Sequence, residues 1–196
     1  LQNYCSLPNH TINFNPSNYV TDGDDGASME NTLDIEIIAG LCPNSTITIY
    51  FGENSFDGFY NAIYNAVNDT INNKIISISW GLSEKYVPSN TFSSFRTLFQ
   101  QANNKGITIC CASGDNGSSD GYTNLSLDFP SCIPECISCG GTSANSSLSE
   151  TTWSGTGGGF STKVKALSYT TSVVNPTSLN VNLAPQSIKT NRSSPD

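Results

Sequence analysis

The chain has 196 residues, of which 12% are charged, 36% hydrophobic and 10% aromatic, and its net charge is -8 at pH 7. This apolar and aromatic content excludes a disordered chain. The acidic balance argues against nucleic acid and against anionic membrane surfaces as partners, because both are bound through basic patches. It is compatible with work in an acidic medium, and plain solubility is the alternative interpretation. No apolar run approaches the ~18 residues of a membrane span.

Helical and strand patterns alternate along the first half of the chain. Apolar residues recur at helical spacing in three segments, and short β-rich runs lie between them. The predicted helices are Ser28–Gly40, Phe56–Val67 and Thr91–Asn103, and the predicted strands are Thr46–Phe51, Lys74–Trp80 and Ile107–Ala112. This alternation predicts βαβ units and an α/β fold with a parallel sheet. Ligands of such sheets bind at the carboxyl ends of the strands, where Gly52, Gly81 and Gly114 lie.

The composition also predicts how the chain is organised. Residues 1–27 carry no regular pattern and are expected to form an irregular entry segment. Residues 28–163 contain the α/β pattern. Residues 164–196 are rich in Ser, Thr, Asn and Pro and are expected to be loop-rich and to end within a larger structure. We therefore expect one partial domain over residues 1–196.

Two places in the sequence offer carboxyl groups for chemistry. Glu30 and Asp34 are four residues apart on the first predicted helix, so both project from one face. Close approach would raise one pKa and make that group a proton carrier at mildly acidic pH, whereas a solvated acidic first turn is the alternative. Asp115 follows a buried strand directly, within Ser113–Gly117. A nearly buried Asp115 would have a raised pKa and donate a hydrogen bond as the neutral acid, and an ordinary turn is the alternative.

Histidine and cysteine restrict the chemistry further. His10 is the only histidine and lies in a polar, Asn-rich stretch, so a histidine-based serine triad has little support. The segment Cys132–Cys139 has CxxxC and CxxC spacing and offers three cysteines, whereas zinc needs four ligands. Cys110 and Cys111 lie in an apolar strand and are expected to act as small buried hydrophobes. Mostly free cysteines are expected, with a disulfide framework or a metal site as alternatives.

Motifs along residues 28 to 163 resemble the sedolisins, the serine-carboxyl peptidases with a subtilisin-like fold. Their order and gaps agree with that family over most of the chain. The motifs are Glu30-x-x-x-Asp34, Ile76-Ser77-Ile78-Ser79-Trp80-Gly81, Ser113-Gly114-Asp115-Asn116-Gly117-Ser118, Asp128-Phe129-Pro130 followed by Pro134 and Gly140-Gly141-Thr142, and Thr156-Gly157-Gly158-Gly159-Phe160-Ser161. Asn116 replaces the usual serine of its motif.

The resemblance implies a doubly wound, mainly parallel sheet flanked by helices and an acid-active serine peptidase. It implies Glu30 as the general base for a serine nucleophile, Asp34 as the group that holds and polarises Glu30, and Asp115 as the protonated oxyanion residue. Physical chemistry agrees with these roles. A glutamate remains a base in acid, where imidazole is charged, and a neutral aspartic acid stabilises a developing oxyanion.

The resemblance also implies a peptide or protein substrate. Trp80 and Asp128 lie where the family shapes its substrate cleft, and Ser79, Trp80 and Gly81 would offer backbone to an extended peptide. A secreted location or an acidic compartment is implied as well. The oligomeric state is not implied by any of these features.

The expected nucleophile is missing from these residues. The family's Gly-Thr-Ser segment lies downstream of a stretch that Arg192–Asp196 resembles, and the family's calcium site lies further on as well. Gly141-Thr142-Ser143 mimics the nucleophile motif but matches an earlier strand by order. We therefore expect the base side of a triad without its serine, no cofactor within the chain, and no activity of the chain alone. A catalytically inactive sedolisin-like protein and a peptide-binding or structural α/β domain are the alternatives.

Overall fold

The computed structural model describes residues 11–15, 25–69, 73–165 and 191–195. The chain divides into two compact units, Leu1–Asn72 and Asn73–Asp196. We call them the N-terminal and the C-terminal unit, and each is described by itself. One partial domain over residues 1–196 stays a prediction.

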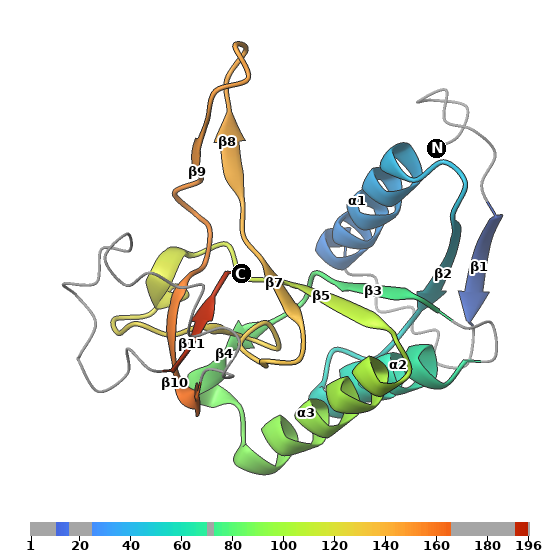
Figure 1. The fold of residues 1–196 in the computed structure, drawn as a ribbon, viewed down its shortest axis with the longest axis horizontal. Helices are drawn as coiled ribbons and strands as arrows, with labels where there is room; N and C mark the ends of the chain where they lie inside the picture. Colours follow the sequence, from blue (N-terminus) through green and yellow to red (C-terminus); the bar gives the residue numbers. More distant parts are fainter. Residues whose placement is uncertain (1–10, 16–24, 70–72, 166–190, 196) are drawn as a thin grey trace. The chain divides into compact units, whose positions relative to one another are not determined.

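The N-terminal unit pairs two strands and contains two helices. Its elements are β1 (Thr11–Asn15), α1 (Asp25–Leu41), β2 (Thr46–Tyr50) and α2 (Phe56–Asn68) (Figure 1). β1 and β2 are parallel, in the register Thr11↔Thr46 to Asn15↔Tyr50. The prediction that residues 1–27 are irregular is therefore wrong at β1 and at the start of α1. A five-residue strand carries too little alternation to be recognised before its ladder partner is known.

The two helices of this unit differ in how well their apolar residues are covered. Ser55 caps α2, because its hydroxyl accepts a hydrogen bond of 3.0 Å from the Gly58 N–H. α2 buries Ile63 and Val67. The predicted apolar side of α1 is present, but Leu33 is 50% and Ile37 54% exposed.

The C-terminal unit is built on a parallel sheet of β3 (Ile75–Ile78), β5 (Thr108–Ala112) and β7 (Ile137–Cys139), in the order β3-β5-β7. Helix α3 (Ser89–Asn104) connects β3 to β5 and packs against β5 (Figure 1). Phe95, Leu98 and Phe99 of α3 are buried, as the helical spacing predicted. The α/β class with a mainly parallel sheet is confirmed.

Short antiparallel pairs complete the C-terminal unit. β4 (Leu82–Ser83) pairs with β6 (Asp128–Phe129), β8 (Thr142–Ala144) with β9 (Glu150–Thr152), and β10 (Gly159–Lys165) with β11 (Asn191–Ser194). Two 3-10 turns, η2 (Glu84–Tyr86) and η3 (Gly117–Ser119), follow β4 and β5. The β8–β9 hairpin extends away from the sheet (Figure 1). β11 lies in the segment predicted to be loop-rich, most of which falls outside the described residues.

The cysteines with described positions are free thiols: Cys42, Cys110, Cys111, Cys132, Cys136 and Cys139. Cys111 is buried as predicted, whereas Cys110 is half-buried. Burial is the main cause that raises the pKa of the Cys111 and Cys132 thiols well above the ordinary value. Among the described residues no cluster of three or more His, Cys, Asp or Glu is suited to a metal. None of the described helices is long and apolar enough to cross a membrane.

Candidate functional site

Asp128 is the buried acid of the C-terminal unit. It lies in β6 opposite Ser83 of β4 and is 8% exposed. Burial is the main cause that raises the pKa of Asp128 from 3.8 to about 7. The charges of Asp120 and Asp115 raise the pKa further, while a hydrogen bond from the Phe129 backbone lowers it. Within the described part of the chain, Oδ1 of Asp128 has no hydrogen-bond partner, which fits a carboxyl that stays neutral in mild acid.

Two glycines lie against this carboxyl, and they come from the ends of two neighbouring strands. A Cβ on Gly81, beyond β3, would lie 2.4 Å and 2.7 Å from the two carboxyl oxygens of Asp128. A Cβ on Gly114, beyond β5, would lie 3.0 Å from Oδ2, and Gly114 has a φ of +98°. A side chain at Gly81 would therefore displace the carboxyl. The carboxyl ends of β3 and β5 meet at Asp128, at the sheet edge where the sequence predicted chemistry.

Asp115 lies beside this buried acid, since its charge acts on Asp128. It follows Gly114 directly, and its side chain is exposed. The sequence left two alternatives for Asp115, a nearly buried acid and an ordinary turn residue, and the exposed side chain does not fit the first. The buried acid at this place is Asp128. The oxyanion role of Asp115 stays a prediction.

The glycine-rich segment supports the turn that carries Asp115. The Gly157 N–H donates to the Gly114 carbonyl at 2.8 Å, and the Ser113 hydroxyl donates to the Gly157 carbonyl at 3.2 Å. A Cβ on Gly157 would lie 1.8 Å from the Ser113 carbonyl oxygen, so only glycine fits there. The motif Thr156–Ser161 therefore has a physical role, since it buttresses Ser113 and Gly114 from one side.

The residues predicted to bind a peptide follow β3. Ser79 and Trp80 are half-buried, and Gly81 is exposed beside Asp128. They fall outside the ladder, because β3 ends at Ile78 rather than at the predicted Trp80. Their backbone role toward substrate stays a prediction.

The predicted base pair lies in the N-terminal unit. Glu30 and Asp34 are one turn apart on α1, and both are half-buried. Glu30 lines an open hollow of about 500 Å³ together with residues of the same helix, namely Ser28, Met29, Thr32, Leu33 and Glu36. The expected hydrogen bond between Glu30 and Asp34 stays a prediction, as does the assembly of these carboxyls with Asp115.

Two residues considered in the sequence are placed away from this arrangement or not placed at all. Ser143 lies in β8 opposite Thr151 and is exposed, in the hairpin that extends from the sheet. Its position agrees with the motif order, which matched it to a strand rather than to a nucleophile. His10 lies outside the described residues.

Sequence reasoning missed Glu84 and Asp120. Glu84 is 0% exposed, three residues after Gly81, and no motif signals it. Asp120 is half-buried at a φ of 50°, and burial raises its pKa. A non-glycine residue in the left-handed region is the one signal that Asp120 gives, and it depends on the structure.

The α/β fold with its parallel sheet agrees with comparisons to known proteins. Residues 17–191 match the subtilase family, and the chain belongs to that family. Kumamolisin from Bacillus sp. (strain MN-32) is 36% identical over 158 residues, which cover 74% of this chain and 29% of kumamolisin. Within the family the chain is thus related to the serine peptidases of the sedolisin class.

The solved structures agree on the fold. The structure of Pseudomonas sedolisin, a serine-carboxyl proteinase complexed with two molecules of pseudo-iodotyrostatin, matches with a TM-score of 0.81 at 23% identity. The match covers 100% of this chain and 58% of the sedolisin chain. A lanthipeptide protease matches with a TM-score of 0.53 at 19% identity, over 83% of this chain and 56% of that one. The subtilisin-like fold is confirmed, and the chain spans less than two thirds of the length of these relatives.

Proposed function

We propose that this chain supplies the base and oxyanion residues of an acid-active serine-carboxyl peptidase that cleaves peptides or proteins. The observation that carries the proposal is the buried Asp128 carboxyl, held between Gly81 and Gly114 where β3 and β5 end. A pKa of about 7 leaves this acid neutral at acidic pH. The related proteins supply the class of reaction.

Each predicted residue has a defined step. Glu30 accepts the proton of a serine hydroxyl, and Asp34 orients Glu30 from one turn away. Asp115, as the neutral acid, donates a hydrogen bond to the oxygen of the tetrahedral intermediate. The serine itself would come from residues other than Leu1–Asp196. No cofactor takes part in these steps.

The first test is cleavage by the chain alone. An unstructured protein is incubated with the chain between pH 3 and pH 7, and fragments are followed by mass spectrometry. We expect no cleavage, because no serine of this chain lies in a motif that matches the family's nucleophile by sequence order. Cleavage that is abolished by Ser143→Ala would overturn the motif assignment and make Ser143 the nucleophile.

The second test uses a longer polypeptide that joins this chain to a Gly-Thr-Ser segment. Asp115→Asn should lower kcat by about 10²-fold, the low end for one oxyanion donor, because Asn still donates a hydrogen bond. KM should change little, since the bond forms in the transition state. Asp57→Asn, an exposed carboxyl in the first turn of α2, is the matched control. An unchanged kcat, or an effect confined to a higher KM, would contradict the oxyanion role and indicate that Asp115 is an ordinary turn residue.

A second candidate function is peptide binding without cleavage. The exposed backbone at Gly81 beside a neutral acid suits an extended peptide whether or not a serine is present. Binding of an unstructured peptide to the chain, measured by tryptophan fluorescence, together with an inactive longer polypeptide, would favour this candidate.

A further inference from the structure

Glu84 is a fully buried carboxyl that the proposed steps do not use. It begins η2 directly after β4 and is 0% exposed. Its carboxyl accepts three hydrogen bonds from the start of β10. The Ser161 hydroxyl donates to Oε2 at 2.6 Å, and the Thr162 N–H and hydroxyl donate to Oε1 at 2.7 Å and 3.0 Å. Charged groups are rarely buried unless their hydrogen bonds are satisfied, so this arrangement needs a reason.

The backbone of Glu84 is fixed to the segment that carries Asp128. The Glu84 N–H donates to the Leu127 carbonyl at 2.8 Å, one residue before Asp128. Ser83, the residue before Glu84, pairs with Asp128 across β4 and β6. The Ser83 hydroxyl is hydrogen-bonded to the Ser126 hydroxyl. Glu84 is thus attached to the strand pair that presents the buried acid.

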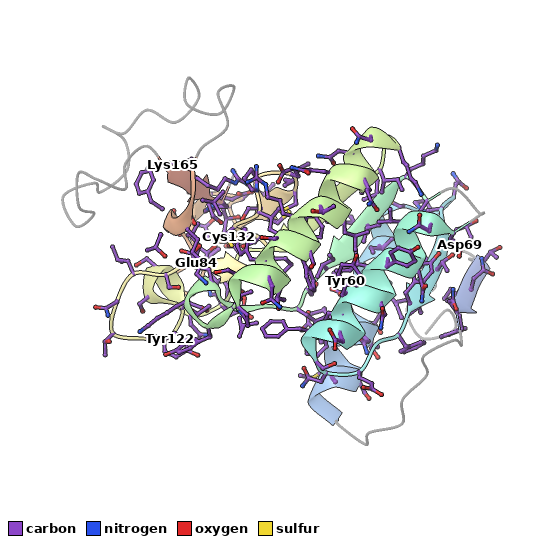
Figure 2. All side chains as sticks on the ribbon, turned by 90° about the horizontal axis from the view of Figure 1, so that it is seen from below. Tyr60, Asp69, Glu84, Tyr122, Cys132 and Lys165 are labelled. Carbon is purple, nitrogen blue, oxygen red and sulfur yellow. The ribbon has the colours of Figure 1, made fainter. Side chains whose placement is uncertain are left out.

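The side chain of Glu84 is fixed to a different segment, the start of β10. Ser161 and Thr162 continue the glycine-rich segment, whose Gly157 is hydrogen-bonded to both Ser113 and Gly114. Gly114 in turn lies against the Asp128 carboxyl. A single residue therefore connects the β4–β6 pair to the segment that supports the Gly114 turn. In Figure 2 Glu84 lies next to Cys132, whose thiol is also hydrogen-bonded to the Glu84 carboxyl.

We propose that Glu84 is a positioning residue that joins the β4–β6 pair, which carries Asp128, to the glycine-rich segment that supports Gly114, and thereby places Asp115 for its work on the substrate. The part that concerns Asp115 rests on the proposed function. The part that concerns the surroundings of Asp128 rests on the hydrogen bonds of Glu84 alone. The two parts therefore need separate measurements.

Glutamine cannot replace Glu84 without loss, although it has the same shape. The Ser161 oxygen already accepts from the backbone N–H groups of Lys163 at 3.0 Å and Val164 at 2.9 Å. A hydroxyl has one donor and two lone pairs, so Ser161 must donate to its remaining partner. The NH₂ group of a glutamine is also a donor. It would face the Ser161 hydroxyl in one orientation of the amide and the Thr162 N–H in the other, so two donors meet in both. The start of β10 should loosen, and water should reach Asp128.

The experiment follows the Asp128 carboxyl by NMR titration of the chain with ¹³C-labelled aspartate. In Glu84→Gln we expect the pKa of Asp128 to fall from about 7 to below about 6, since burial is the main cause of its elevation. The amide signals of Gly114 and Gly157 should shift as well. Glu135→Gln is the matched control, because Glu135 also accepts side-chain hydrogen bonds, from Arg96 at 3.0 Å and Gln100 at 2.9 Å.

A purely structural role would give a different result. Both variants would then lose thermal stability while the pKa of Asp128 stays near 7, and this outcome would overturn the inference. If Glu84→Gln does not fold, Thr162→Val removes only the 3.0 Å hydroxyl bond and keeps the N–H bond. A smaller fall of the Asp128 pKa supports the inference in that variant, and an unchanged pKa overturns it.

The catalytic part is read separately in the longer polypeptide. Glu84→Gln should lower kcat about 10-fold or more with little change in KM, because misplacement of Asp115 weakens the transition state rather than substrate binding. A loss confined to KM would overturn this part. If the unsubstituted polypeptide cleaves nothing, the proposed function fails, while the titration of Asp128 still decides whether Glu84 fixes the surroundings of Asp128.

Discussion

Asp128→Asn tests whether the buried carboxyl is neutral in the folded protein. Its pKa is raised from 3.8 to about 7, first by burial and then by the charges of Asp120 and Asp115. Because the folded pKa lies above the unfolded one, the contribution to stability is full below pH ~3.8, declines as the pH rises and is lost above pH ~7. A pKa difference of about 3 corresponds to about 4 kcal/mol of unfolding free energy, at ~1.36 kcal/mol per pKa unit.

Urea denaturation followed by tryptophan fluorescence measures this contribution. Trp80 and Trp153 are the only tryptophans, and both lie in the C-terminal unit with Asp128. The unfolding free energy of the parent, taken relative to Asp128→Asn, should fall by about 4 kcal/mol between about pH 4 and pH 8, because asparagine does not ionise. Asp57→Asn, which removes an exposed carboxyl and keeps Asp128, is the control and should retain the fall seen in the parent. Parallel pH curves for the parent and Asp128→Asn would refute the reasoning.

Three further substitutions have defined outcomes. Gly157→Ala should destabilise the C-terminal unit by about 3 kcal/mol in urea denaturation, because the Cβ of alanine would lie 1.8 Å from the Ser113 carbonyl oxygen. An unchanged denaturation midpoint would mean that the backbone at Ser113 moves without a cost in stability. Ser55→Ala should remove the cap of α2 and lower the unfolding free energy by about 1 kcal/mol, measured by circular dichroism. Asp120→Asn should lower the pKa of Asp128 in an NMR titration, because the Asp120 charge is the second cause of its elevation; an unchanged pKa would leave burial as the cause that matters.

The sequence predicted the elements in which an apolar pattern extends over enough residues to be recognised. The three helices and the strand at Ile107–Ala112 have such spacing, and each is present. β1 and β6 were not predicted, because strands of five and two residues are defined by their ladder partners rather than by their own pattern. Gly114 was placed just beyond its strand correctly, whereas Gly81 lies three residues beyond the end of β3. That both touch Asp128 depends on β6, which brings in a third segment.

The outer side of α1 shows another limit of sequence patterns. The spacing of Leu33 and Ile37 predicted a helix with an apolar side, and the helix forms. Periodicity identifies which residues share a side, whereas the packing partner is a property of the whole fold. Both residues are about half exposed, so the prediction of the helix was right without any prediction of what covers it.

The two acids Asp115 and Asp128 show why the site itself was harder to predict than the fold. From the sequence, Asp115 was the candidate for a buried acid, because it follows a buried strand, and an ordinary turn was the alternative. A carboxyl is desolvated by what surrounds it, however, and the groups around Asp128 come from Gly81 and Gly114, far away in the chain. The acids still act on one another, since the charge of Asp115 contributes to the raised pKa of Asp128. A neutral Asp128 adds no negative charge near the substrate oxyanion that Asp115 is proposed to stabilise. Protonation of the buried acid would therefore favour the reaction in acid.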